Sequence, residues 1–527
     1  MRRGRMVAVG AVAAGVLGAL VAPAMGNEGA GADPALMTEA ATGAEQPTAS
    51  FAPEPSPGVV TQAAWAGPGS VVTRPADFRL KSGADLARKV AKLDAMLPKQ
   101  GVQKILRYAN RPLLTGGDCR TDPFGKGDKG KDPLEPAKKY CFKDDDANSV
   151  EWIPQAVTGA SDAAKDEKWG AKRPILIGSY DDDNTGRTKK GCKKKASDKC
   201  NEKGVRITFV DPATNKYRHA LLVWPYVSKK SKKITFDAIH ANDRKGQTGI
   251  HIGGMAWYKN YLYVADTYNG IRVFDMRKIM DLDPDNKPST NDTLSGGYRT
   301  DVKNKKKIGR HGKTWYGFGY RYVMPQVATW TFQAKQHNKA TAGKKNKKKI
   351  TYCATSGAPK ASYLSIDRSV SPHELIMGEY CRSTPSHPST GRLTGYALDP
   401  GTGKLASRGG VTRTPAWGFY LPKEGMQGAA RYDGRYYLNQ SKKYDNGSIV
   451  RAKPFPKRGL LAYGSDVPTA VGPEDLYVEH GRRTGNPALL WSVSEHRPAD
   501  HPTKCGQPSP CGRVIYAHRI KDIQARP

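Results

Sequence analysis

The chain has 527 residues, of which 38% are hydrophobic, 25% charged and 9% aromatic, with 56 Gly and 37 Pro. This composition excludes a coiled coil and a largely disordered chain, and its glycines and prolines indicate frequent turns. The 85 Lys and Arg against 49 Asp and Glu give a net charge of +36, which favours partners that carry dense negative charge.

The first 24 residues have the pattern of an export signal. Residues 1–5 are basic, residues 6–21 are apolar and uncharged, and Ala22-Pro23-Ala24 supplies the small residues of a cleavage site. We expect cleavage after Ala24, with Ala32 as the alternative. No later segment has the roughly 18 consecutive apolar residues of a membrane helix. The sequence therefore predicts a secreted, extracellular protein with no membrane span.

The chain contains eight cysteines. Disulfides are expected in an exported protein, and no Cys-x-x-Cys or zinc-type Cys/His spacing occurs. Pairing of sequence neighbours gives Cys119 with Cys141, Cys192 with Cys200, Cys353 with Cys381, and Cys505 with Cys511. Nested and crossed pairings stay open, because spacing alone does not determine connectivity.

The region before residue 150 is expected to flank a larger domain. Residues 25–80 are rich in Ala, Gly, Pro, Glu and Thr without periodicity, which predicts a flexible leader. A helix is predicted from Ser82 to Pro98, with Ser82 and Asp85 in a capping-box pattern. Its apolar face is Leu86, Val90, Leu93 and Leu97. We expect the helical and loop segment 81–149 to pack on a domain formed by residues 150–527.

From about residue 150, short runs of Val, Ile, Tyr and Trp alternate with turn residues, which is typical of an all-β protein. Aligned with one another, these runs give an irregular repeat of four strands. The expected first strands begin at Gln155, Gly253, Ser362, Gln427 and Glu474. The expected second strands end at Ser179, Asp266, Glu379, Gln440 and Glu495. Fourth strands fit at residues 219–224, 320–325, 407–417 and 460–466, and the fifth unit lacks one.

Radially repeated four-stranded units predict a β-propeller, with five blades favoured, six as the alternative, and a pair of β-sandwiches as the competing architecture. We expect a segment from before residue 150 to supply the missing strand and close the ring. The run LYVADTYNGIRVFD at residues 262–275 resembles an NHL-type propeller repeat. Residues 150–521 as a whole resemble the wider propeller superfamily, which implies a ligand site at one face or in the central channel.

In an antiparallel blade, the start of the first strand and the end of the second lie on one face. This topology predicts a channel mouth with several carboxylates and amides. The candidates are Gln155, His251, Asp266, Glu379, Gln427, Glu474, Asp475 and Glu495. Such a group could bind Ca²⁺. Alternatively, two of its carboxyls could have different pKa values, so that one acts as an acid and the other as a base. Alternatively, each acid accepts hydrogen bonds from its own turn.

A second calcium candidate lies at Asp281, Asp283, Asp285 and Asp292, at positions one, three, five and twelve of a loop. These positions resemble an EF-hand loop, although Asn286 stands where that loop has Gly. A resemblance to calcium-dependent lactonases and other propeller hydrolases is at the level of fold only. Gln155, Gln427 and Glu474 occupy the places of their metal ligands, whereas Gly253 and Ser362 depart from that pattern.

The positive charge is concentrated in lysine-rich loops. These runs are 189–195, 229–233, 303–307 and 344–349, and all but the third are expected on the face of the channel mouth. Lys193, Lys194, Lys195, Lys347, Lys348 and Lys349 are the candidates for binding an anionic polymer. Lysine rather than arginine favours diffuse contact over specific recognition of nucleic acid. Alternatively, these runs are only solubilising insertions.

The sequence favours a secreted, monomeric propeller that binds an anionic extracellular or cell-wall ligand. The alternative is a hydrolase or lyase that works at the acidic mouth, with or without Ca²⁺. Gly-x-Ser-x-Gly, His-Glu-x-x-His and phosphate-binding glycine motifs do not occur, so serine hydrolases, zincins and nucleotide-binding proteins lose their simplest support. Whether the chain is an enzyme is not decided by these patterns.

Overall fold

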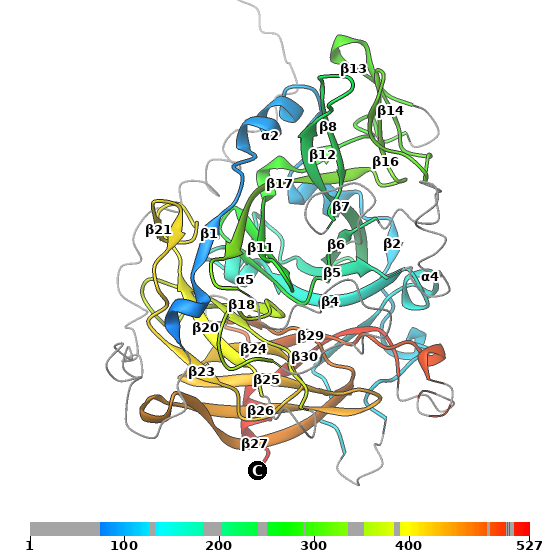
Figure 1. Ribbon diagram of the computed structural model, residues 1–527. Helices are drawn as coiled ribbons and strands as arrows, with labels where there is room; N and C mark the ends of the chain where they lie inside the picture. The colour runs from blue at the N-terminus through cyan, green and yellow to red at the C-terminus, as the bar shows by residue number, and fades with distance from the viewer. Residues whose placement is uncertain are drawn as a thin grey trace, which may run out of the picture.

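A computed structural model describes the chain from Arg74 to Pro527, with gaps (Figure 1). The described residues are 74–125, 132–182, 203–240, 250–287, 291–335, 353–383, 390–481, 485–501, 503, 505 and 511–527. They form the five blades of a β-propeller, as the sequence predicts.

Each blade has four strands, and their boundaries follow the predicted repeat. Blade 1 is β4 (Trp152–Gly159), β5 (Ile175–Asp181), β6 (Val205–Asp211) and β7 (Lys216–Val227). Blade 2 is β9 (Met255–Tyr258), β10 (Tyr261–Asp266), β11 (Gly270–Asp275) and β17 (Tyr322–Phe332). Blade 3 is β18 (Tyr363–Asp367), β19 (Glu374–Gly378), β20 (Arg392–Ala397) and β23 (Gly418–Tyr420). Blade 4 is β24 (Met426–Tyr432), β25 (Arg435–Lys442), β26 (Asp445–Phe455) and β27 (Leu460–Val471).

Blade 5 combines the two ends of the domain. Its strands are β28 (Tyr477–Glu479), β29 (Leu489–Val493), β30 (Val514–Arg519) and β3 (Lys138–Cys141). β3 pairs antiparallel with β30, so the prediction that a segment before residue 150 closes the ring is confirmed. The innermost strands complete the circle, because β4 contacts β9 and β28, β9 contacts β18, β18 contacts β24, and β24 contacts β28.

The hydrophobic core lies between neighbouring blades. For example, Ile376 and Leu393 of blade 3 pack with Ala429 and Leu438 of blade 4, and comparable clusters fill the spaces between the other blades. Strands with both faces covered need near-continuous apolar runs, which is why the runs of Val, Ile and Leu reveal them in the sequence. At the axis, a β-carbon on Gly253 would lie 1.9 Å from the Ser362 carbonyl oxygen. Gly253 therefore permits close packing of the inner strands.

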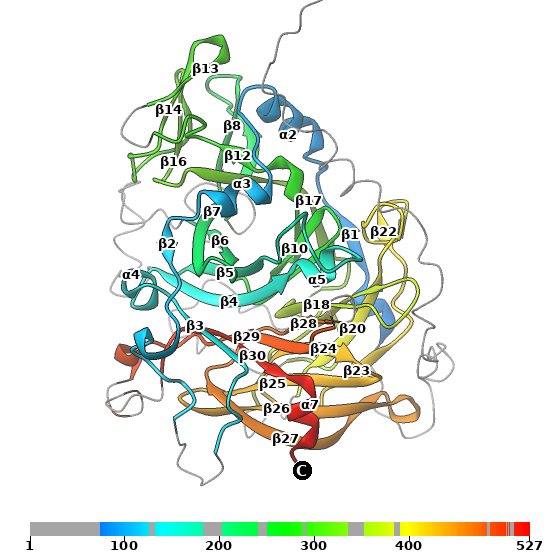
Figure 2. The ribbon, with the colours of Figure 1, turned by 180° about the vertical axis from the view of Figure 1, so that it is seen from behind.

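The N-terminal segment runs along the outside of the propeller (Figures 1 and 2). It contains η2 (Pro75–Phe78), β1 (Leu80–Ser82), α2 (Ala87–Asp94), α3 (Val102–Arg107), β2 (Arg111–Pro112), η3 (Gly116–Asp118) and α4 (Asp144–Ala147). The predicted helix exists but begins at Ala87, because Ser82 ends a strand and donates its N–H to Gly410. Asp85 accepts the N–H of Ala87 at 2.8 Å, which fixes the entry to the helix.

The fourth strand predicted at 407–417 is wrong. β21 (Ser407–Arg408) and β22 (Val411–Thr412) form a hairpin, and β22 pairs with β1 outside blade 3. Gly409 and Gly410 both have positive φ, at 59° and 74°, so the chain reverses there. The fourth strand of blade 3 is the shorter β23 that follows.

Insertions decorate the blades at the top of Figure 1. β8 (Ile234–Ala238) extends β7, while β12 (Met280–Asp281) pairs with β17. A small sheet contains β13 (Thr293–Leu294), β14 (Tyr298–Asp301), β15 (Ile308–His311) and β16 (Thr314–Gly317). The remaining described elements are η5 (Met276–Lys278), η6 (Ser295–Gly297), α5 (Ala160–Ala163), η7 (Pro456–Arg458), η8 (Pro498–Asp500) and α7 (Ile520–Ala525). In the described ranges, no helix has the length and apolarity needed to cross a membrane.

Three of the four predicted disulfides are present. They join Cys119 to Cys141, Cys353 to Cys381, and Cys505 to Cys511. The fourth predicted pair, Cys192 with Cys200, lies outside the described residues. The three bridges confirm pairing between sequence neighbours, and they agree with the predicted blade register.

Candidate functional site

Two β-bulges place glutamines at the channel mouth. In blade 1 the pairing of β4 with β5 skips Gln155, and in blade 4 the pairing of β24 with β25 skips Gln427. A bulge redirects one side chain away from the regular alternation of a strand, and bulges recur beside functional sites. The Gln155 amide donates to Glu495 Oε2 at 2.7 Å, and the Gln427 amide donates to Glu474 Oε1 at 3.1 Å.

Glu474 and Glu495 form a pair of interacting carboxyl groups. Glu474 precedes β28 and is fully buried, while the Glu495 side chain follows β29 and is 20% exposed. Burial raises the pKa of Glu474 well above its usual range, and the negative charge of Glu495 raises it further. Neighbouring carboxyls disfavour a second charge, so Glu474 binds a proton more tightly than an isolated glutamate does. Glu495 is the member of the pair that meets solvent.

Asp475 connects blades instead of facing the mouth. Its Oδ2 accepts the N–H of Met255 at 3.0 Å and that of Val157 at 3.3 Å, from the inner strands of blades 2 and 1. The side chain is fully buried, and burial raises its pKa well above the usual range. These bonds to strands of two other blades make Asp475 a structural element of the axis.

Two tyrosines that the sequence analysis missed flank the carboxyl pair. Tyr180 and Tyr380 follow Ser179 and Glu379, the predicted second-strand ends of blades 1 and 3. Burial raises the pKa of both phenols, and the charges of Glu474 and Glu495 contribute. The sequence does contain an indication of these tyrosines: in every blade, the residue directly after the end of the second strand has a polar group on its side chain. His251 joins this side of the mouth, with its ring 4.5 Å from that of Tyr180.

Asp266 and Glu379 do not join the pair, which corrects the expectation of a common acidic group. Arg272 donates to Asp266 Oδ2 at 2.9 Å, and Arg392 donates to both oxygens of Glu379, at 2.7 and 3.1 Å. Each arginine comes from the third strand of the same blade and is almost wholly buried. Asp266 also accepts from Asn269 in its own turn, as the alternative interpretation expects.

These arginines belong to a repeat that the sequence analysis also missed. A glycine precedes an arginine by one or two positions where the third strand begins in four blades. The arginines are Arg206, Arg272, Arg392 and Arg513, and all four are buried. In blade 5, Arg513 donates to the Glu495 carbonyl oxygen at 2.7 Å instead of to its carboxylate. The Glu495 carboxylate is therefore left free to pair with Gln155 and Glu474.

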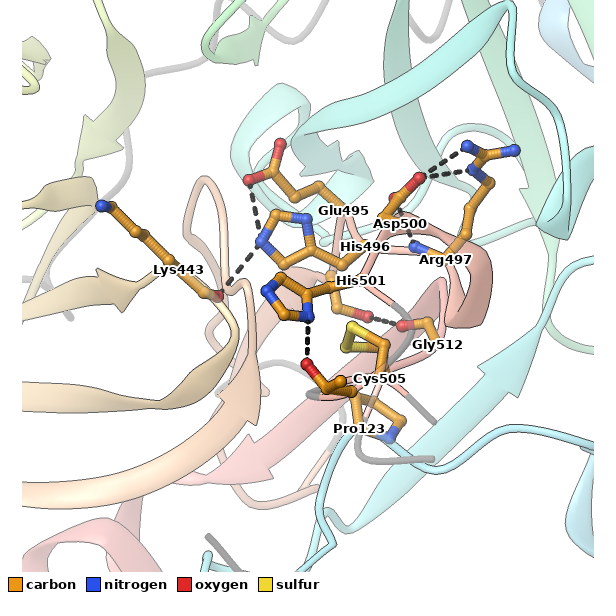
Figure 3. Close-up of a disulfide and its surroundings, with 12 residues drawn as sticks. Pro123, Lys443, Glu495, His496, Arg497, Asp500, His501, Cys505 and Gly512 are labelled. Carbon is orange, nitrogen blue, oxygen red and sulfur yellow. Dashed lines mark hydrogen bonds and ion pairs between the residues drawn. A yellow bond between two sulfur atoms is a disulfide. The ribbon is translucent and has the colours of Figure 1, made fainter. Parts of the chain in front are cut away.

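The loop after Glu495 fixes the position of this acid (Figure 3). His496 Nε2 lies 3.5 Å from Glu495 Oε1 and 3.1 Å from the Lys443 carbonyl oxygen. Arg497 and Asp500 are joined by a backbone and a side-chain bond, which closes the turn that follows. The Cys505–Cys511 disulfide lies beside the same turn in Figure 3.

The second calcium candidate is partly assembled. It lies in the insertion of blade 2, which is the segment between β11 and β17. Oxygens of Asp283, Asp285 and Asp292 lie within 4.8 Å of one another, and Asp283 and Asp292 are 2% and 7% exposed. Each of these two has one buried oxygen, Oδ1, without a hydrogen-bond partner. Burial raises the pKa of Asp283 to about 6, and Asp292 adds to the shift. This buried acidic cluster can hold a metal ion.

Asp281 does not belong to that cluster, contrary to the expected four-acid loop. Arg321 donates to its Oδ1 at 2.7 Å and to its Oδ2 at 2.8 Å, so both oxygens are occupied. Cys353, Glu379 and Cys381 also lie close together, but the two sulfurs form a disulfide and Glu379 is bound to Arg392. That second group therefore lacks free metal ligands.

The six lysines predicted to bind an anionic polymer, Lys193 to Lys195 and Lys347 to Lys349, lie outside the described residues. Two other lysine-rich runs are described. Lys229, Lys230, Lys232 and Lys233 are exposed, as are Lys303, Lys305, Lys306 and Lys307.

Comparison with known proteins gives only distant similarities. No family model matches the chain, and no curated protein does. Among solved structures, a GH43_1 enzyme from Xanthomonas citri complexed with xylose has 10% identity and a TM-score of 0.29, covering 71% of this chain and 90% of that one. A chain of the Mitotic Checkpoint Complex has 9% identity and a TM-score of 0.28, covering 75% and 98%.

CoXyl43, a GH43 β-xylosidase/α-arabinofuranosidase from a compost microbial metagenome, has 7% identity and a TM-score of 0.29, covering 74% and 94%. Similarity at this level carries no argument about activity, ligand or site residues.

Proposed function

We propose that this chain is an exported propeller hydrolase or lyase whose acid–base centre is the carboxyl pair of Glu474 and Glu495. The pairing itself carries the proposal. Two carboxyls that interact electrostatically, one wholly buried and one partly exposed, can have the separated proton affinities that acid–base catalysis uses. The titration belongs to the pair as a unit.

In this proposal Glu495 is the catalytic residue, because its side chain is the member of the pair that solvent reaches. Glu474 acts through Glu495: it holds the proton that the pair retains and so tunes the basicity of its neighbour. Gln155 and Gln427 position one carboxyl each through the bonds at 2.7 and 3.1 Å. Tyr180 and Tyr380 supply phenol O–H groups beside the pair.

Substitution of the two glutamates tests the proposal, with 4-nitrophenyl esters, lactones and 4-nitrophenyl glycosides as the substrate panel. We expect Glu495→Gln to lower kcat/KM by roughly 10² or more, the usual contribution of a positioned acid or base. Glu474→Gln should shift the pH profile of the activity that is left. Glu424→Gln is the control, because the Glu424 carboxylate accepts the Ser383 N–H and, in the described part of the chain, forms no hydrogen bond with either glutamate of the pair. Unchanged turnover in Glu495→Gln contradicts the proposal.

The net charge of +36 supports a second function, the binding of an anionic extracellular or cell-wall polymer. The exposed runs at Lys229 and Lys303 place part of this charge at the surface. Retention on teichoic-acid-bearing walls, without turnover of any substrate in the panel, favours binding over catalysis. Both functions fit an exported protein, and the three disulfides accord with an oxidising compartment.

We also propose that the cluster of Asp283, Asp285 and Asp292 binds Ca²⁺. Carboxylate oxygens are the ligands this ion prefers, and the buried Oδ1 atoms of Asp283 and Asp292 have no hydrogen-bond partner among the described residues, although Asp283 Oδ2 lies 3.4 Å from Arg321 Nη1. The ion would hold the insertion of blade 2 together and take no part in chemistry at the mouth.

A further inference from the structure

A cavity of about 280 Å³ lies between blades 3 and 4. Glu374 is the first residue of β19, and Glu379 follows the last residue of that strand. The cavity beside Glu374 and the Glu379 side chain therefore lie at opposite ends of blade 3. The second strands of all blades run the same way, and Glu495 follows β29. The cavity is therefore separate from the channel mouth, with the hairpin β21–β22 on its outer side.

Glu374 is the unusual group in this cavity. Its Oε2 accepts the indole N–H of Trp417 at 2.9 Å. Among the described residues, no lysine, arginine or histidine nitrogen forms a salt bridge with this carboxyl group. A partly buried carboxylate without a salt-bridge partner is costly.

The backbone leaves room for this carboxyl. A β-carbon on Gly395 would lie 2.5 Å from Glu374 Oε2 and 2.7 Å from a ring carbon of Trp417. Any larger residue at position 395 would displace the carboxyl or the indole. The sequence therefore accommodates an acid and an aromatic ring together at one wall of the cavity.

The other charges near Glu374 are already matched or exposed. Arg431 of β24 donates to Asp367 Oδ2 of β18 at 2.8 Å, and Asp367 is fully buried. Arg413 lines the cavity from the exposed side of the hairpin. Arg431 also lines the cavity and interacts electrostatically with Glu374, so a ligand cation would share the Glu374 carboxylate with Arg431.

Aromatic and apolar groups form the remaining wall. Trp417 stacks on Phe419 with ring centroids 5.1 Å apart, and Tyr436 meets Trp417 edge-on at 6.1 Å. Pro372, Pro415 and Ala416 add apolar surface. These rings and apolar side chains offer a surface against which an apolar body can pack.

We propose that this inter-blade cavity binds a primary ammonium group carried on a small apolar body. The ammonium would pair with the Glu374 carboxylate, and the apolar body would lie against Trp417 and Tyr436. The volume is at the lower end of small-molecule sites, which suits an alkylamine that carries one aromatic ring. This binding is independent of catalysis at the channel mouth.

The proposal includes a pH dependence. Burial raises the pKa of Glu374 to about 7, Asp367 adds to this shift, and Trp417 and Arg431 oppose it. An ammonium ligand needs the carboxylate form, and apparent affinity scales with the fraction in that form. The affinity should therefore rise by about tenfold between pH 6 and pH 8.

Calorimetric titration with benzylamine, against benzyl alcohol as the neutral control, tests the cavity. We expect benzylamine to bind the full chain more tightly at pH 8 than at pH 6, and benzyl alcohol to bind at least tenfold more weakly. Glu374→Gln should abolish the preference for the amine, whereas Glu424→Gln should keep it. Thermal unfolding of each variant checks that the propeller is intact. Equal binding of both probes, equal amine binding in Glu374→Gln, or no amine binding at pH 8 each overturns the proposal.

Discussion

Cys141, the last residue of β3, lies opposite Val514 at the start of β30 and is also bonded to Cys119. One residue thus closes the fifth blade by backbone pairing and ties that strand to the N-terminal segment. Ring closure in this propeller depends on a strand that only four residues build. The disulfide compensates by restricting the unfolded chain around that strand.

We expect the double variant Cys119→Ser/Cys141→Ser to lose about 2–4 kcal/mol of unfolding free energy. The control is Cys505→Ser/Cys511→Ser, which opens a loop with a sequence separation of 6 instead of 22. The entropic model makes the control loss smaller by about 1 kcal/mol. Denaturant unfolding followed by tryptophan fluorescence measures both losses. A larger loss in the control would show that β3 does not limit closure.

Buried histidines should make the fold sensitive to acid. Burial lowers the pKa values of His219, His373 and His518 from 6.5 to about 4. Between these values the unfolded chain binds protons that the folded chain does not, so stability falls as the pH falls from about 6.5 to 4. Each histidine lowers the free energy of unfolding by up to about 3 kcal/mol over this pH range.

His518→Gln isolates one of these contributions, because glutamine can still bond to Thr469, which lies 2.9 Å from the ring nitrogen. We expect the variant to gain stability relative to the natural chain as the pH falls from 6.5 to 4, in urea unfolding at several pH values. His311→Gln is the control at an exposed site. Parallel pH profiles for the natural chain and His518→Gln would contradict the expectation.

The Glu379–Arg392 pair should be required as a unit. Glu379→Gln leaves a buried guanidinium without its carboxylate, which typically costs about 3–5 kcal/mol. We expect the double variant Glu379→Gln/Arg392→Met to lose less than the two single variants added together. A double-mutant cycle from denaturant unfolding measures the coupling. Additive losses would show that Arg392 is stabilised by other contacts, such as its bond to the Gly357 carbonyl oxygen at 3.0 Å.

Calcium should stabilise the insertion of blade 2. An ion that binds only the folded chain raises the melting temperature with its concentration, and EDTA should reverse the increase. Asp283→Asn should abolish the shift, whereas Asp301→Asn, in β14 of the same insertion, should leave it unchanged. A calcium shift that survives Asp283→Asn places the ion elsewhere. No shift in the natural chain rejects the site.

The strand repeat could be predicted because buried strands need apolar runs. The closing strand could be predicted because a five-unit repeat that lacks its last strand needs another segment of the chain to supply it. The sequence predicts which acids lie near the channel mouth, but not which side chain each of them contacts. Whether an acid meets an arginine or another acid depends on side-chain partners from strands far apart, as Arg272 with Asp266 and Gln155 with Glu495 show. The sequence contains no indication of the Glu374 cavity, because its walls come from six strands and a hairpin.

The last prediction concerns the lysine-rich loops at 189–195 and 344–349. If they bind a polyanion, each neutralised charge releases a counterion, and affinity falls steeply as salt rises. Retention on a dextran sulfate column should depend less steeply on salt concentration after Lys193 to Lys195 and Lys347 to Lys349 are replaced with Ser. We expect the free energy of unfolding to change little, because the sequence predicts solvated loops there and exposed charges contribute little to stability.

The matched control removes as many charges elsewhere: Lys303, Lys305, Lys306 and Lys307, with Lys313 and Lys335, are replaced by Ser. The blade topology predicts the 303–307 run away from the mouth, so this variant should keep a steep salt slope. Equal flattening in both variants would mean that net charge alone governs retention. If the natural chain is not retained even at low salt, the loops bind no polyanion and the channel mouth is left as the site of function.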